Sequence, residues 1–230
     1  MPAQPSNLQA RRIQINQRGA EMRVLIACEY SGIVRDAFLK KGFDAYSCDI
    51  LDCESKFNQD PSRHFKCDVL EVLNQDWDLM IAHPPCTHLA VSGARWFKDK
   101  QQEQKEALDF VRMLLDAPIK HIALENPVSV ISSKIRKPDQ IIQPWQFGHE
   151  AQKTTCLWLK NLPHLKHTKV VDKGEFTTFK SGKRHPKWYA DALKLSKHER
   201  MKARSKTFQG IADAMADQWG DIIQNYDITE

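Results

Sequence analysis

Short apolar runs alternate with helical patterns along most of the chain. The apolar runs have the character of β-strands and lie at residues 22–28, 44–51, 64–72, 76–83 and 119–127. Between them, apolar residues recur at helical spacing at 33–38 and at 107–115. Strands that alternate with helices form parallel sheets with helices on both faces. The pattern therefore predicts an α/β fold with a doubly wound, mostly parallel sheet.

Length and composition favour one main domain with a small lobe. The chain of 230 residues is 41% hydrophobic and 27% charged, which is ordinary for a globular protein. Positions 1–21 are polar, and we expect a disordered tail there before Met22. The predicted division is a main domain at 22–158, a small basic C-terminal lobe at 159–206, and a helix at 207–230 that packs back on the main domain.

Cysteines are spread singly along the chain, at positions 28, 48, 53, 67, 86 and 156. The chain shows no secretory signal, and no apolar run reaches the roughly 18 residues that a membrane span requires. These features indicate reduced thiols in a cytoplasmic protein. The cysteine spacing lacks the close pairs typical of zinc sites. We therefore expect no metal and no membrane partner. A monomer is the expected form, and the oligomeric state is left open.

Basic charge is concentrated in one part of the chain, the basic segment (residues 160–206). It contains 14 Lys and Arg against 4 Asp and Glu, whereas the rest of the chain contains 20 against 25. A local positive excess of this kind is the footprint expected of a protein that binds a phosphate backbone. The alternative is a solvated charged face that binds nothing.

The apolar run at 76–83 is followed by two prolines and a cysteine. Proline has no N–H to donate to a strand ladder, so Pro84 and Pro85 lie just past the strand and Cys86 lies in a loop. A loop thiol held by two fixed φ angles is either a positioned nucleophile or a small apolar residue at a turn.

Glu125 lies at the end of the next apolar run. Burial at a sheet edge raises the pKa of a carboxyl group, which suits a residue that delivers a proton near neutral pH. The alternative is a turn tied down by hydrogen bonds from Glu125 and Asn126. The carboxyl ends of neighbouring parallel strands meet at one crevice, so we expect Cys86 and Glu125 to lie together.

Two aspartates follow earlier strands in the same way. An acid after the second strand of a doubly wound sheet accepts hydrogen bonds from ribose hydroxyls, and Asp49 and Asp68 have such positions. Both also suit the N-cap of a helix. The turn after the first strand contains only Gly32 and lacks G-x-G-x-x-G, so it is not a dinucleotide fingerprint.

Several motifs occur in the order found in one enzyme family. The Pro-Pro-Cys and Glu-Asn-Val motifs of cytosine-5 DNA methyltransferases resemble HPPC at 83–86 and ENP at 125–127. The family's S-adenosylmethionine turn resembles LIACEYSGIVRDAF, and its two acidic positions resemble CDI and CDV. Its Tyr-Gly-x-x-Gln-x-Arg-x-Arg segment is similar to FGHEAQKTTCLWL, and its closing motif to FQGIADAMADQWG. The chain most resembles short phage and prophage members of this family, from Met22 to about Gly220.

The resemblance implies the Rossmann-like fold of S-adenosylmethionine-dependent methyltransferases. It also implies that the main domain is catalytic and binds S-adenosylmethionine, and that the small lobe recognises DNA. The residues that match the family's cofactor positions are Glu29, Tyr30, Ser31, Gly32, Asp49, Ile50, Asp68, Val69, Pro84 and Gly210.

The resemblance assigns catalysis to three residues. The Cys86 thiolate would attack carbon 6 of cytosine, which makes carbon 5 able to take the methyl group. Glu125 would protonate ring N3, and Lys153 would replace a family arginine near the cytosine carbonyl or the flipped phosphate. His83 and His88 flank the cysteine loop, and we assign them no catalytic role.

A base in duplex DNA must be flipped out of the stack, and phosphate contacts must offset the cost. We expect these contacts in and near the loop-like stretch FKSGKRHPKWY at 179–189. The predicted nucleic-acid-binding residues are Gln152, Lys180, Lys183, Arg184, Lys187 and Trp188. The alternative is a surface loop whose aromatic side chains pack inward.

The chain also departs from the family pattern. Its first turn lacks the Phe-x-Gly-x-Gly glycines, the arginines of the Gln-x-Arg-x-Arg motif are replaced, and Gly210 lacks the usual following asparagine. The short recognition region leaves open the same chemistry on a free nucleotide or on RNA. The altered motifs leave open a non-catalytic nucleic-acid-binding protein that retains the methyltransferase fold.

Overall fold

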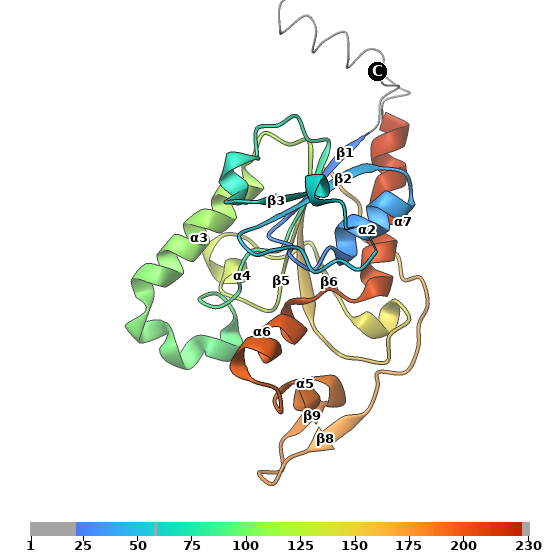
Figure 1. Ribbon diagram of the computed structural model, residues 1–230. Coiled ribbons are helices and arrows are strands. Elements are labelled where there is room, and N and C mark those ends of the chain that lie inside the picture. Colours follow the sequence, from blue (N-terminus) through green and yellow to red (C-terminus); the bar gives the residue numbers. More distant parts are fainter. Residues whose placement is uncertain (1–21, 58, 227–230) are drawn as a thin grey trace, which may run out of the picture.

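The structure, a computed structural model, describes residues 22–57 and 59–226 (Figure 1). The tail expected at 1–21 lies outside the described residues. A seven-stranded sheet has the order β3-β2-β1-β4-β5-β7-β6, and β7 runs antiparallel to both of its neighbours. The strands are β1 Arg23–Ala27, β2 Asp44–Asp49, β3 His64–Lys66, β4 Leu79–Ala82, β5 His121–Asn126, β6 Gln140–Ile142 and β7 Thr155–Lys160.

Helices connect these strands and follow the last of them. The α-helices are α2 Ile33–Lys40, α3 Gln101–Leu115, α4 Ile131–Lys134, α5 Lys187–Ala192, α6 Lys197–Ser205 and α7 Gln209–Tyr226. Short 3-10 helices are η1 Pro61–Arg63, η2 Val69–Glu71, η3 Val91–Asp99 and η4 Pro144–Gln146. A separate hairpin pairs β8 Phe176–Thr178 with β9 Arg184–Pro186, and it projects away from the main sheet (Figure 1).

Alternate residues of the central strands face two different cores. Val24 and Ile26 pack on the side of α2 and α7, and Leu25 and Ala27 pack on the side of α3 and α4. Figure 1 shows these helix pairs on opposite sides of the sheet. The α/β class and the mostly parallel sheet with helices on both faces are confirmed. The strand order reverses between β1 and β4, which is where such sheets bind ligands.

The C-terminal part differs in detail from expectation. The predicted boundary at residue 159 falls inside β7, and Leu165 still packs in the main core. The stretch HPKWY, expected as a loop, forms the end of β9 and the beginning of α5. The terminal helix packs back on the main domain through Ile211, Met215 and Trp219, as its apolar stripe predicted.

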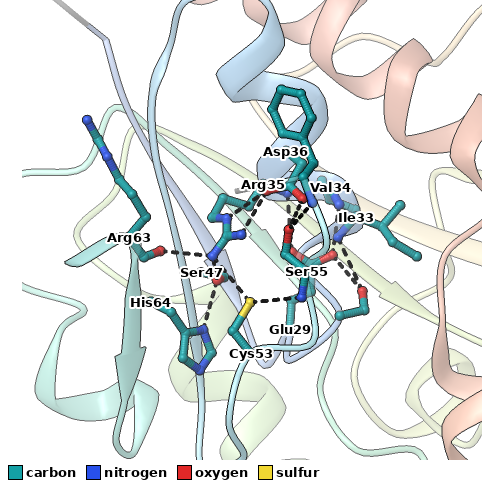
Figure 2. Close-up of polar contacts among 12 residues, drawn as sticks. Glu29, Ile33, Val34, Arg35, Asp36, Ser47, Cys53, Ser55, Arg63 and His64 are labelled. Atoms are coloured by element: carbon teal, nitrogen blue, oxygen red, sulfur yellow. Dashed lines mark hydrogen bonds and ion pairs between the residues drawn. The ribbon is translucent and has the colours of Figure 1, made fainter. Parts of the chain in front are cut away.

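A buried arginine joins α2 to the loops beside it (Figure 2). Arg35 has no exposed surface and donates to Asp36 Oδ1 from Nε at 3.0 Å and from Nη2 at 2.8 Å. Its Nη1 reaches Ser47 Oγ at 3.2 Å, Cys53 Sγ at 3.3 Å and the Arg63 carbonyl at 3.4 Å. A buried charge is tolerated only when it is paired and hydrogen-bonded in this way. The network therefore holds the start of α2, and the turn before it, in one position.

Replacing Arg35 with Met should lower the free energy of unfolding by about 3–5 kcal/mol, because Asp36 stays buried without its cation. Arg112→Met on α3 is the matched control. Its ion pair with Asp109 is about half exposed, so removing it should cost less than about 1 kcal/mol. Urea unfolding followed by circular dichroism measures both changes. Equal losses of stability in the two variants would contradict a structural role for the Arg35 network.

Candidate active site

The loops that follow β4 and β5 are joined at the carboxyl edge of the sheet. Asn126 is buried, and its Nδ2 donates to the Pro84 carbonyl at 3.0 Å. The carbonyl of Cys86 accepts the N–H groups of Leu89 at 3.1 Å and Ala90 at 2.9 Å. The cysteine loop is thus a hydrogen-bonded turn that lies directly beside the end of β5.

Glu125 is hydrogen-bonded to a histidine on the neighbouring strand. Ala82 pairs with Leu124 in parallel register, so the next residues, His83 and Glu125, stand opposite each other. His83 Nδ1 lies 3.0 Å from Glu125 Oε2, and the two side chains are only 10% and 12% exposed. Sequence reasoning missed this role of His83. The available signal was its position one residue past β4, opposite the acid that ends β5.

The pKa of Glu125 is the result of opposing effects. Burial raises the pKa, but the hydrogen bond with His83 and the positive charge of Lys153 lower it by more, so the net pKa lies below its ordinary value. The expectation of a raised pKa is therefore wrong for the protein alone. Glu125 is ionised near neutral pH and must gain a proton before it can donate one to a bound base.

Cys86 is the exposed member of six free thiols. Partial desolvation by surrounding atoms raises the pKa of its thiol, and the charge of Glu125 raises it further, whereas Arg204 and Lys153 act in the opposite direction. The net pKa lies above the ordinary value, so the thiol is protonated at neutral pH. It must lose a proton before it can act as a nucleophile.

Arg204 is a second residue that sequence reasoning missed. It lies on α6, and its guanidinium carbon is 5.0 Å from the centroid of the Tyr189 ring. Its charge acts on Cys86 across 118 positions of sequence, and no local pattern predicts a contact of that range. A basic residue of the C-terminal part therefore belongs to the surroundings of the candidate nucleophile.

A small pocket opens beside Glu125. It is lined by Glu125, Lys153, Thr155, Thr207, Phe208 and Ile211. Lys153 Nζ donates to the Lys206 carbonyl at 3.0 Å, which ties the chain before β7 to the chain before α7. The pocket brings a carboxylate, an ammonium group and an aromatic ring together. As the structure stands, the pocket has room for roughly one water molecule.

Two predicted cofactor residues of the first turn, Glu29 and Ser31, make contacts at the start of α2. The Glu29 carboxylate accepts the N–H groups of Val34 at 2.8 Å and Arg35 at 3.2 Å (Figure 2). Ser31 Oγ donates to the same carboxylate at 3.1 Å. A helix N-terminus is an anion site. Here the protein's own carboxylate fills it.

The other two residues of this turn also have structural contacts. The Tyr30 hydroxyl donates to the Lys202 carbonyl at 3.1 Å and lies 2.9 Å from Ser205 Oγ, both on α6. Gly32 has a φ of 71°, and a Cβ there would lie 2.7 Å from the Cβ of Ser55. Only glycine fits this position without strain.

The next predicted cofactor residues lie at the ends of β2 and β3: Asp49, the exposed Ile50, Asp68 and the buried Val69. Asp49 Oδ1 accepts the N–H of Leu51 at 3.0 Å, and burial raises the pKa of this carboxyl. Asp68 caps η2 by accepting the N–H of Leu70 at 3.0 Å, as the N-cap alternative predicted. Burial, and then the charges of these two aspartates, raise the pKa of Cys28 to about 12. Both carboxylates therefore lie near the first turn.

Gly210 lies at the beginning of α7 and allows a close approach of two chain segments. A Cβ at this position would lie 1.9 Å from the Phe147 carbonyl oxygen, and its N–H donates to His149 Nε2 at 2.8 Å. The structure thus gives Gly210 a packing role. Pro84, the remaining predicted cofactor residue, is buried at the start of the cysteine loop.

The predicted nucleic-acid-binding residues divide into two groups. Lys180, Lys183 and Arg184 are exposed in the β8–β9 hairpin, and Lys187 is exposed at the start of α5. Lys187 forms an ion pair with Glu175. The hairpin therefore presents its basic side chains to solvent.

Trp188 and Gln152 form the second group. Trp188 Nε1 donates to the Gln152 carbonyl at 2.8 Å, and its ring lies 6.1 Å from that of Phe208. This contact joins α5 to the main domain. It favours the alternative in which the aromatic residues of this stretch pack inward.

Comparison of the chain with models of known protein families and with curated proteins finds no match. Within residues 22–57 and 59–226, no group of three or more His, Cys, Asp or Glu side chains is arranged to hold a metal ion. In the same ranges, no helix is both long and apolar enough to cross a membrane. Function must therefore be inferred from the geometry of the site.

Glu125→Gln should speed the alkylation of Cys86 by iodoacetamide at pH 8 by roughly three- to tenfold. Removal of the nearby negative charge lowers the thiol pKa, and one pKa unit changes the thiolate fraction about tenfold. Lys153→Met should slow the reaction for the opposite reason. Mass spectrometry of the Cys86 peptide gives the rate. Asp217→Asn, the same charge change at the distant ion pair with Lys41, should have no effect.

Proposed function

We propose that the protein is an S-adenosylmethionine-dependent methyltransferase that methylates carbon 5 of cytosine in DNA. The observation that carries the proposal is the placement of Cys86 and Glu125. Cys86 follows β4, and Glu125 lies near the end of the adjacent parallel strand β5. A hydrogen bond joins the two chain segments, and Lys153 lies near both residues. The same three residues were assigned to catalysis from the order of the sequence motifs.

Each of these side chains has a role that its surroundings support. Cys86 is exposed and able to reach a flipped base, and it forms the bond to carbon 6 after losing its proton. Glu125, which lies near Cys86, holds a proton at N3 of the base during this attack. Lys153 and Arg204 favour the thiolate over the thiol. They also place positive charge where a nucleotide phosphate would approach.

The first turn suits a cationic ligand better than a phosphate. Because Glu29 occupies the N–H groups of α2, a pyrophosphate has no anion site there, and a second negative charge would be repelled. S-adenosylmethionine, when bound, supplies a methyl group on a positively charged sulfonium. Asp49 is the last residue of β2, at the edge where such sheets bind ribose hydroxyls. The residues present therefore fit this cofactor and not a dinucleotide.

A second candidate is a non-catalytic nucleic-acid-binding protein with the same fold. The contacts of Tyr30 with α6, and of Glu29 with α2, favour it because they reduce the groups left for a cofactor. Calorimetry with S-adenosylmethionine separates the candidates. Binding that is weakened by Asp49→Asn supports the enzyme, whereas an absence of binding supports the second candidate.

Incubation with unmethylated duplex DNA and S-adenosylmethionine should yield 5-methylcytosine, detected by mass spectrometry of the digested nucleosides. Cys86→Ala should abolish the product, because carbon 5 is unreactive without the covalent bond at carbon 6. The variant should still bind S-adenosylmethionine, which shows that it is folded. RNA and dCMP are tested in parallel as acceptors. Product formation by Cys86→Ala would refute the mechanism.

The double variant Lys180→Ala/Lys183→Ala should weaken DNA binding and reduce the slope of log K against log salt by about 1.8, or about 0.9 for each phosphate that is no longer neutralised. The matched control is Lys166→Ala/Lys169→Ala. It removes the same charge from exposed positions of the basic segment near the main domain. Fluorescence anisotropy at several salt concentrations measures both slopes. Equal slopes for the two variants would exclude the hairpin as the region that binds DNA.

A further inference from the structure

His83 has one hydrogen-bonded side-chain partner in the described part of the chain. Its Nδ1 meets Glu125 Oε2 at 3.0 Å, and its Nε2 is buried without a hydrogen-bond partner among the described residues. Buried histidines normally satisfy their ring nitrogens. Among the described residues, the ring of His83 therefore forms a side-chain hydrogen bond with Glu125 alone and is not part of a wider side-chain network.

The backbone holds both residues from two sides. His83 donates its N–H to the Ala27 carbonyl at 2.9 Å, so β1 restrains it. Glu125 pairs with Leu157 of β7 on the other side. The side chains of His83 and Glu125 lie on the same face of the sheet as Ile81, and α7 packs on this face. Because each position is fixed by a strand ladder, the ring and the carboxylate have little freedom to separate.

We propose that His83 is a positioning residue for Glu125 in the cytosine-5 methylation proposed above, on which this inference rests. Its ring binds Oε2 and leaves Oε1 to meet the exocyclic amine and N3 of the flipped base. The carboxylate is then held in one orientation before the base arrives, so the site does not lose the entropy of ordering it during the reaction.

The titratable groups that interact with Glu125 come from several elements, and one of them, Cys156, packs on the opposite face of the sheet. His83 follows β4, Lys153 precedes β7, and the thiols of Cys86 and Cys156 lie in the cysteine loop and on β7. The histidine and the lysine lower the pKa of the carboxyl against the effect of burial. Without His83, burial is opposed by Lys153 alone. The pKa of Glu125 must then rise.

Two replacements of His83 separate its hydrogen bond from its volume. His83→Phe keeps the ring without a donor, and His83→Asn places an amide N–H close to the position of Nδ1. The carboxyl of Glu125, labelled with ¹³C, is titrated by NMR. His83→Phe should raise its pKa by about one unit or more, and His83→Asn should recover part of the difference. His88→Phe, on the other side of Cys86, is the matched control and should leave the titration unchanged.

Methylation by the same variants tests the link to the reaction. His83→Phe should lower kcat roughly tenfold with KM for DNA nearly unchanged, because the carboxyl group is no longer held in one orientation. Since the reaction requires the protonated form of Glu125, the raised pKa should move the alkaline limb of the pH profile to higher pH. His83→Asn should restore most of kcat. An unchanged carboxyl titration in folded His83→Phe would overturn the inference, as would an unchanged kcat and pH profile. If His83→Phe shifts the titration but the wild-type protein methylates no acceptor, the proposed function is overturned. The positioning of Glu125 by His83 then still stands.

Discussion

The parallel register of β4 with β5 determines what the candidate site can do. It pairs Ala82 with Leu124, and so brings His83 opposite Glu125 on the face that α7 covers. A slip of one residue would turn one member of the pair to the other face of the sheet and separate the ring from the carboxylate. Pro84 ends the ladder immediately afterwards because it has no N–H to donate, and its carbonyl is held by the side chain that follows Glu125. Strand pairing therefore sets the distance between the nucleophile loop and the acid.

A second constraint holds the turn on the cofactor side. Arg35 is fully buried, and its guanidinium joins α2 to β2 and to the loops that follow it (Figure 2). The Glu29 carboxylate caps the same helix from the turn before it. Buried charges of this kind are costly unless every partner is in place. The chain can satisfy all of these hydrogen bonds in one arrangement, and this arrangement keeps the turn rigid beside the carboxyl edge of β2.

Sequence patterns were sufficient for the features that depend on local periodicity. The alternation of strands and helices predicted the sheet, and the prolines after β4 predicted a loop at Cys86. The direction of the pKa shift of Glu125 was not predictable, because it depends on His83, which is 42 positions away in the sequence. The partner of Trp188 was not predictable for the same reason, because its hydrogen bond with Gln152 spans 36 positions. Periodicity shows which face of an element is buried, but it does not show which partner covers it.

The end of the basic segment forms part of the main domain's site. Tyr30 binds the last turn of α6 from the first turn, and Glu54 pairs with Lys202 and with Lys206. The carbonyl of that second lysine holds Lys153 beside Glu125. One continuous set of contacts therefore runs from the turn after β1, through α6, to the lysine of the pocket. Because these contacts share one helix, a change at the first turn that moves α6 must also move the positive charge that favours the Cys86 thiolate.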